Sequence, residues 1–324
     1  MEYLKFVVQV LLIVLAFFGY LKVAEKYGIV DVPNQRSSHK LVTIRGAGII
    51  FFVAILAHHI FYQFPYPYFL IGVTLLVAVS LIDDILSVSP LVRFLCQLLA
   101  MFFLFWELEM VNTLQWWCVP VGVFGLAMLN AYNFMDGING ITGIYTLVFL
   151  VSLLLLTSLL TLQDVKLIYL MIASIVIFGF FNFRGEAKVF AGDAGSMSLA
   201  FLVLFYLLTI IWQAADVSFV LLLAVYGIDS FWTIVVRLRR GERIYTAHRS
   251  HLYQHLSNEK AWPHLKVALL YGAIQLLINL LVIGNFFYQL VPGKILLLAV
   301  LILLSVVYLT IRRFVTMVPK ASDQ

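Results

Sequence analysis

The chain has 324 residues, of which 63% are hydrophobic and only 11% are charged. A soluble domain carries about a quarter charged residues, so this composition excludes one and predicts an all-α polytopic membrane protein. The formal charge of +5 does not indicate nucleic-acid binding, because the basic residues lie between apolar segments and form no patch with aromatic residues. Two cysteines, Cys96 and Cys118, are too few for a disulfide framework or a zinc site.

Apolar segments of about 20 residues can cross a bilayer, and polar residues divide this chain into eleven such segments. The first has no small-residue cleavage site before Lys22 and is interpreted as an uncleaved span. The prolines fall in connections or at segment ends, as helices require. The predicted spans are 3–22, 46–63, 68–85, 90–106, 115–133, 141–161, 166–183, 194–213, 217–237, 265–288 and 293–311.

The lysines and arginines predict the orientation. With the N-terminus on the periplasmic side and the C-terminus in the cytoplasm, all basic residues except Lys5, Lys166 and Lys294 lie in inner loops or the C-terminal tail. The outer loops are short and show no residues typical of chemistry. We therefore expect one membrane-embedded domain, 1–324, with its active-site loops facing the cytoplasm at about 25–45, 83–90, 130–143, 183–196 and 237–265.

The first inner loop, DVPNQRSSHKLVTIRGAG at 31–48, combines basic residues that include Lys40 and Arg45 with a Gly-Ala-Gly that opens the second span. Backbone amides at a helix start bind phosphate well, so this loop is a candidate phosphate-facing surface. The alternative is a loop whose charges only set the topology.

Asp83 and Asp84 end the third span. Neighbouring residues on a helix diverge by about 100°, so the two carboxylates are expected to take separate roles, one facing a metal or pyrophosphate and one a proton. A hydrated helix end is a weaker explanation, because two acids at a helix C-terminus oppose the macrodipole.

The stretch NAYNFMDGINGITG at 130–143 places three asparagines and an aspartate between two spans. Such residues are costly in lipid and mark a site by default. Asn130 and Asn133 share a face if the helix continues through them, and Asp136 follows where Gly137 could break it. Gly140 and Gly143 permit close backbone approach, although glycines at this spacing also serve helix packing.

The loop NFRGEAKVFAGDAGS at 182–196 places Asp193 among glycines at the start of the eighth span. Asp193 alone could be a helix N-cap. Phe190 offers a face on which a base could stack, although a lone aromatic is more often packing. Asp229, inside the ninth span, is expected to be buried and paired, with a structural role.

The longest inner loop contains RLRRGERIYTAHRSHLYQHL. His248, His251 and His255 recur on one face if a helix forms there. A three-histidine zinc site is disfavoured, because the other metal-type residues are hard oxygen donors that suit magnesium. Next to Arg249, the histidines fit phosphate donors better. A peripheral amphipathic surface on anionic lipid is the alternative.

These motifs in this order resemble the polyprenyl-phosphate N-acetylhexosamine-1-phosphate transferases, the glycosyltransferase family 4 type that includes MraY, WecA and WbpL. The opening DVPNQRSSH and the spacing HRSHLYQH are most similar to the WbpL-like branch, which initiates O-antigen or other surface polysaccharides. Asn139 departs from the aspartate of many bacterial members. The matching positions are Asp83-Asp84, Asn130 to Asn133, Asp136 to Gly140, Asn182-Phe183, Phe190 to Ser196 and the histidine loop.

The resemblance implies that Asn133 and Asp193 bind Mg²⁺, or Mn²⁺ in its place, and that Phe190 stacks on uracil. It implies Asp83, Asp84 and Asp193 as catalytic residues, with Asp83 or Asp84 contacting or activating the lipid phosphate. Of the two, Asp83 is expected to handle the acceptor phosphate and its proton. Direct attack and a covalent aspartyl intermediate both stay open. The implied substrate-binding residues are Lys40, Arg45, Asn130, Asp136, Asn139, Asn182, Phe190, His248, Arg249, His251 and His255.

The function expected from the residues and the resemblance is transfer of N-acetylhexosamine 1-phosphate from a UDP-sugar to undecaprenyl phosphate, with release of UMP. The enzyme would lie in the inner membrane among lipids, with a homodimer compatible and no nucleic-acid partner. The sugar stays open among GlcNAc, GalNAc, FucNAc and QuiNAc. The alternative is a transporter or flippase of a polyprenyl-linked or nucleotide-linked sugar, which would need polar residues through the membrane and on both faces.

Overall fold

The computed structural model describes residues 1–33, 41–86, 88–113, 116–243 and 249–317. In these ranges the regular secondary structure is helical apart from one two-stranded sheet, β1 (Val30–Asp31) paired antiparallel with β2 (Thr43–Ile44). The helices are α1 (Glu2–Tyr27), α2 (Ile49–Phe61), α3 (Pro67–Leu86), α4 (Pro90–Glu107), η1 (Met110–Thr113), α5 (Cys118–Met135), α6 (Ile141–Leu154), η2 (Thr157–Leu159), α7 (Leu162–Asn182), α8 (Gly192–Ala214), η3 (Val217–Leu223), α9 (Ala224–Arg239), α10 (Leu252–Gln254), η4 (His255–Glu259), α11 (His264–Tyr288) and α12 (Gly293–Met317).

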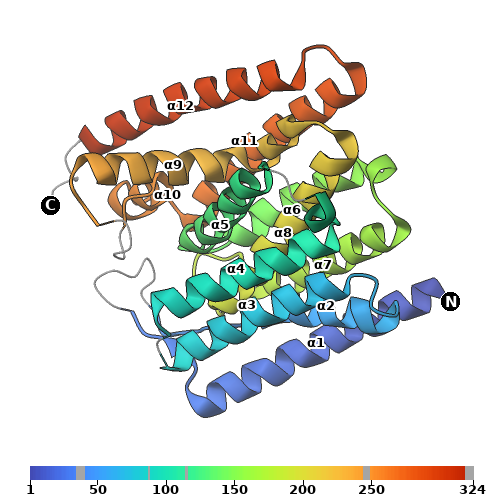
Figure 1. Ribbon diagram of the computed structural model, residues 1–324. Helices are drawn as coiled ribbons and strands as arrows, with labels where there is room; N and C mark the ends of the chain where they lie inside the picture. The colour runs from blue at the N-terminus through green and yellow to red at the C-terminus, as the bar shows by residue number, and fades with distance from the viewer. Residues whose placement is uncertain (34–40, 87, 114–115, 244–248, 318–324) are drawn as a thin grey trace, which may run out of the picture.

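Each predicted span corresponds to a helix of this structure. Eight helical segments in the described residues are long and apolar enough to cross a membrane, and α2, the stretch Pro67–Asp83 of α3, and α6 are shorter apolar helices. An all-α polytopic membrane protein is therefore confirmed. The number of crossings and the sidedness of the termini stay predictions. The start of α1 and the end of α12 lie at opposite ends of the bundle (Figure 1), as an odd number of crossings would require.

Helix α8 is the centre of the bundle. Inside the protein, 94% of its spanning window is buried, whereas the corresponding figures are 17% for α1 and 6% for α12. Figure 1 shows α1 and α12 at opposite edges of the molecule, with α8 between them. The α2, α3 and α5 helices all pack on α8. A helix that is apolar all round is expected to be buried in this way.

Antiparallel packing of α3 on α8 brings the two acidic motifs to one end of the bundle. The Phe69 and Phe201 rings stack with centroids 5.4 Å apart, and Tyr66 meets Phe205 at 5.0 Å, so residues earlier in α3 meet residues later in α8. From the contact level of Phe201, Asp193 lies about 12 Å back along α8 by helical rise. Asp83 lies further along α3 in the same direction, so both acids belong to the same end.

The ninth predicted span is not one continuous α-helix. Its first part is the 3₁₀ helix η3, which ends where α9 begins. Gln275 of α11 holds the junction, because its Nε2 donates to the Leu221 carbonyl at 2.9 Å and its Oε1 accepts from the Val225 amide at 3.0 Å. Irregular backbone at membrane depth needs such internal partners.

The end of the bundle opposite the acidic motifs carries polar contacts between helix ends. Lys166 pairs with Glu2 at 2.5 Å, and the Tyr66 hydroxyl donates to Asp164 at 2.6 Å. These groups bond to one another and join α1, α7 and the turn before α3. They are therefore structural contacts of the helix ends.

Candidate active site

The first inner loop and the start of α8 are joined backbone to backbone. The Ala47 amide donates to the Phe190 carbonyl and the Gly48 amide to the Ala191 carbonyl, both at 3.0 Å. A Cβ on Gly48 would lie 2.6 Å from the Gly195 Cα, so only glycine fits. The expectation that the amides at the start of α2 face phosphate was therefore wrong for Ala47 and Gly48, because these donors hold the neighbouring loop.

This junction places Arg45 beside Asp193. The Arg45 Nη2 lies 3.3 Å from the Asp193 Oδ1, with 39% and 26% of the two side chains exposed. The pair therefore sits at a partly open surface and is accessible to a ligand. Asp193 is in the first turn of α8, where the helix dipole stabilises negative charge.

Asp136 is a third charged residue near Arg45 and Asp193. It follows the last residue of α5, where the helix was predicted to break, and is half-buried. Burial raises the pKa of the Asp136 carboxyl to about 6, and the nearby negative charge of Asp193 adds to the rise while Arg45 opposes it. Asn133, one turn earlier, is half-buried, and in the described part of the chain its side chain has no hydrogen-bond partner.

Two predicted substrate-binding asparagines hold the backbone of neighbouring loops. Asn182 accepts from the Gly140 amide and donates to the Val189 carbonyl, both at 2.8 Å. Asn139 donates to the carbonyls of Arg184 and Gly185 at 3.0 and 3.1 Å. Both are nearly buried. They fasten the loop after α5 to the loop after α7.

Asn130 pairs with Gln97 of α4, a residue that the sequence analysis missed. The Asn130 Nδ2 donates to the Gln97 Oε1 at 2.9 Å and to the Leu126 carbonyl at 2.8 Å. Gln97 is a polar residue in the middle of an apolar stretch of α4, and that was the available signal. The direct roles in substrate binding of Asn130, Asn139 and Asn182 stay predictions.

Asp83 closes the turn between α3 and α4. Its Oδ1 accepts from the Val88 amide at 2.7 Å, and its Oδ2 lies 2.8 Å from the Arg93 Nη1. Arg93 was also missed, although it is the only basic residue of α4. The Asp84 side chain lies outside the described part of the structure. The assignment of Asp83 or Asp84 to the acceptor phosphate stays a prediction.

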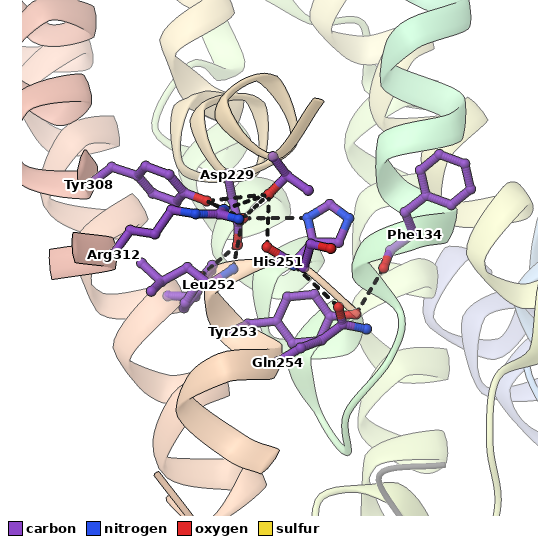
Figure 2. A network of polar contacts seen from close by, with 11 residues as sticks. Phe134, Asp229, His251, Leu252, Tyr253, Gln254, Tyr308 and Arg312 are labelled. Carbon is purple, nitrogen blue, oxygen red and sulfur yellow. Dashed lines mark hydrogen bonds and ion pairs between the residues drawn. The ribbon is translucent and has the colours of Figure 1, made fainter. Parts of the chain in front are cut away.

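The histidines do not act as one group in the structure. His251 is buried, with its Nδ1 3.4 Å from the Asp229 Oδ1 (Figure 2), whereas the His255 Nδ1 lies 2.7 Å from the Glu259 Oε1. Arg249 is half-buried near these residues. Lys40 and His248 lie outside the described residues. The expectation that Asp229 is buried and paired is confirmed.

Tyr253 joins residues 250–254, the histidine segment, to the loop after α5. It was not singled out from the sequence. Its hydroxyl donates to the Phe134 carbonyl at 2.8 Å (Figure 2), and its ring lies over Gly137. Burial and the negative charges of Asp229 and Asp136 raise the pKa of the Tyr253 hydroxyl. The histidine segment is thus placed next to Asp136.

Two phenylalanines of the loop before α8 differ in their surroundings. The Phe183 ring lies against Gly143 and Gly179, where an added Cβ would come 2.7 and 2.6 Å from it, so these glycines serve packing. Phe190 is half-buried, and its amide donates to the Ile44 carbonyl at 2.8 Å. Stacking of Phe190 on a base stays a prediction.

The described residues contain no group of three His, Cys, Asp or Glu side chains that could hold a metal ion by themselves. Magnesium is commonly bound by one or two carboxylates together with substrate phosphates. Asp193 and Asn133 offer hard oxygen donors of this kind, and the nearby Asp136 offers another. The donor set therefore fits a cation that arrives with a phosphorylated substrate.

The fold and the site together define a class, a polytopic membrane protein in which carboxylates, amides and an arginine gather at one end of the bundle beside lipid-facing helices. The model of the glycosyl transferase family 4 matches residues 66–212, a range that includes Asp83 and Asp193 but neither Arg45 nor the histidine segment.

Curated relatives agree with the family match. The chain is 23% identical to a probable undecaprenyl-phosphate N-acetylglucosaminyl 1-phosphate transferase of Bacillus subtilis, over 78% of this chain and 76% of the relative. It is 26% identical to the undecaprenyl-phosphate α-N-acetylglucosaminyl 1-phosphate transferases of Yersinia pestis and Escherichia coli K12, over 72% of this chain and 70% of each relative. These findings support membership of the polyprenyl-phosphate N-acetylhexosamine-1-phosphate transferase family.

Proposed function

We propose that the protein transfers N-acetylhexosamine 1-phosphate from a UDP-N-acetylhexosamine to undecaprenyl phosphate. The observation that carries the proposal is the cluster of Asp193, Arg45 and Asp136, which three segments distant in sequence bring together. The names of the relatives supply the substrate class. We further propose that the enzyme lies in the inner membrane and that its product begins a surface polysaccharide such as O-antigen.

In the proposed reaction, a phosphate oxygen of undecaprenyl phosphate attacks the β-phosphorus of the UDP-sugar. The new P–O bond gives undecaprenyl-pyrophosphate-sugar, and the bond to the α-phosphate breaks to release UMP. One phosphoanhydride replaces another, so no further energy source is required. Catalysis of this kind consists mainly of positioning and of neutralising phosphate charge.

Arg45 is the residue that would receive a phosphate of the nucleotide-sugar, since its guanidinium is partly exposed and already beside the helix start. Asp193 and Asn133 would hold Mg²⁺. When bound there, the cation would neutralise charge on the diphosphate and on the leaving UMP. Asp136 would lie under the nucleotide-sugar, ionised at neutral pH because its pKa is about 6.

Asp83 and Asp84 would serve the acceptor phosphate from the end of α3. Both oxygens of Asp83 already have protein partners. We therefore assign the positioning of Arg93 to Asp83 and the contact with the acceptor's proton to Asp84. The apolar surface beside this end of the bundle would accommodate the lipid tail.

The test is release of UMP by purified protein in detergent with Mg²⁺, undecaprenyl phosphate and a panel of UDP-N-acetylhexosamines. The lipid product is identified by mass spectrometry. Asp193→Asn should abolish release, and Glu186→Gln, an exposed acid of the same loop, should leave it unchanged. Near-normal turnover by Asp193→Asn would refute the metal assignment. Absence of UMP with every sugar, together with flux of one of them across vesicles, would favour the transporter alternative.

A further inference from the structure

Helix α12 buries few residues, and two of the most buried are polar. Only 6% of its spanning window is inside the protein, yet Tyr308 and Arg312 are each only 6% exposed. They are one helical turn apart on one face. Tyr308 donates to Asp229 of α9, and Arg312 donates to the Tyr308 and Thr233 oxygens. A helix with so little packing does not need a buried arginine for its own stability, because taking such a charge out of water is costly. The placement therefore calls for another explanation.

Asp229 is the centre of this contact network (Figure 2). Its Oδ1 accepts from the Tyr308 hydroxyl at 3.0 Å, and its Oδ2 accepts from the Tyr271 hydroxyl of α11 at 2.7 Å. The Arg312 Nη1 donates to the Tyr308 oxygen at 2.7 Å and to the Thr233 oxygen at 3.1 Å. Three helices thus fix the carboxylate of one residue that is only 1% exposed.

The fixed carboxylate holds the histidine segment, defined as residues 250–254. The Leu252 amide donates to the Asp229 Oδ1 at 3.0 Å, and the His251 Nδ1 lies 3.4 Å from the same oxygen. The segment continues to Tyr253, which docks on the Phe134 carbonyl in the loop that carries Asp136. An unbroken series of contacts therefore runs from α12, through Asp229 and the histidine segment, to the candidate active site.

We propose that Asp229 is a positioning residue for the transfer reaction and that Tyr308 and Arg312 of α12 brace it, so that the C-terminal helix sets the place of His251 and Tyr253 at the active site. This inference rests on the proposed function and extends it to α12, a helix at the edge of the bundle. A displacement of about 1 Å in a positioning group can lower a rate by about 100-fold, so the brace has a kinetic consequence.

Adjacent arginines of α12 give a matched pair for the first test. Arg312 is buried in the network, whereas Arg313 is exposed. Carbethoxylation of His251 by diethylpyrocarbonate, followed by peptide mass spectrometry, should be slow in the unaltered protein and in Arg313→Met. It should be about tenfold faster in Arg312→Met and in Asp229→Asn, since opening exposes the ring. Tyr308→Phe is the milder variant if Asp229→Asn does not fold.

A double-mutant cycle for UMP release gives the second test. Asp229→Asn and Arg312→Met should each lower kcat/KM for the UDP-sugar about 10- to 100-fold. If Asp229 acts through His251, the double variant Asp229→Asn/His251→Ala should have a kcat/KM no more than about twofold below that of His251→Ala alone. The inference would be overturned if the losses of kcat/KM caused by Asp229→Asn and His251→Ala multiply in the double variant. It would also be overturned if Arg312→Met behaves like Arg313→Met in both tests.

The two tests separate this inference from the proposed function. If the unaltered protein releases no UMP from any UDP-N-acetylhexosamine, the function fails, and the modification rate of His251 alone then decides the positioning role. If UMP is released normally and His251 is equally protected in all four variants, the positioning role fails while the function stands.

Discussion

Asp136→Asn should make the protein more stable at pH 8 while lowering its activity. In the unfolded chain the Asp136 carboxyl has a pKa of 3.8, and in the folded protein burial, with the charge of Asp193, raises the pKa to about 6. Between these values the folded protein binds a proton that the unfolded chain does not. Stability contributed by this group is therefore present at low pH and lost as the pH rises through 6.

The difference of about two pKa units corresponds to about 3 kcal/mol at most, and the partial exposure of Asp136 reduces this to about 1–2 kcal/mol. Asparagine has no charge to bury, so above pH 7 the free energy of unfolding of the variant should exceed that of the unaltered protein by this amount. For a chain of this size each kcal/mol raises Tm by about 2–4 °C. Thermal unfolding in detergent, followed by tryptophan fluorescence at pH 8 and pH 4, measures the effect.

The gain should be absent at pH 4, where Asp136 is protonated in the folded protein. Glu186→Gln, at an exposed position of the neighbouring inner loop, serves as the control and should leave Tm unchanged at both values of pH. UMP release by the unaltered protein should rise as the pH increases through about 6, and the variant should lack this rise. An equal gain in Tm at both values of pH, or no gain at pH 8, would contradict the argument.

Two further predictions follow from contacts of the inner loops. Gly48→Ala should cost about 1–3 kcal/mol in stability, since its Cβ would meet the Gly195 backbone, and should also lower UMP release, whereas Gly227→Ala, with nothing within 4 Å, should change Tm little. Asp84→Asn should lower UMP release at least about tenfold more than Asp83→Asn, which in turn should match Arg93→Met within about threefold because both break one ion pair. Equal loss in Asp83→Asn and Asp84→Asn, with Arg93→Met unaffected, would return the acceptor role to Asp83.

The helices were predictable because hydropathy alone reports which stretches can face lipid, and each predicted span overlaps observed helix. Some ends differ, since the sixth span was predicted as 141–161 and α6 is Ile141–Leu154. The break between η3 and α9 was not predictable in the same way. Val217 to Arg239 is uniformly apolar at its start, and nothing in it indicates a change of helix type. The partner that stabilises the break, Gln275, lies far along the chain and became visible only through its contacts.

The site was predicted at the level of motifs and only partly at the level of roles. Polar residues at membrane depth must find partners inside the protein whether or not they take part in chemistry, so composition cannot separate the two uses. Asn182 and Asn139 engage carbonyl groups of neighbouring loops. Asp193 and Asp136 instead lie near Arg45, in a partly exposed group of charges.

The contacts of Asn139 and Asn182 help to hold Asp136 near Asp193. Asp193 and Arg45 meet only because Gly48 and Gly195 allow two loops to touch, and Asp136 keeps its place because Asn182 and Asn139 tie its loop to the loop before α8. Like charges such as Asp136 and Asp193 repel each other, so their approach has to be held by such contacts. Burial is the main cause of the raised pKa of Asp136, and the amide contacts help to hold the carboxyl in that buried place. Loss of the Asn182 contact should therefore relax that pKa toward its ordinary value before it unfolds the bundle.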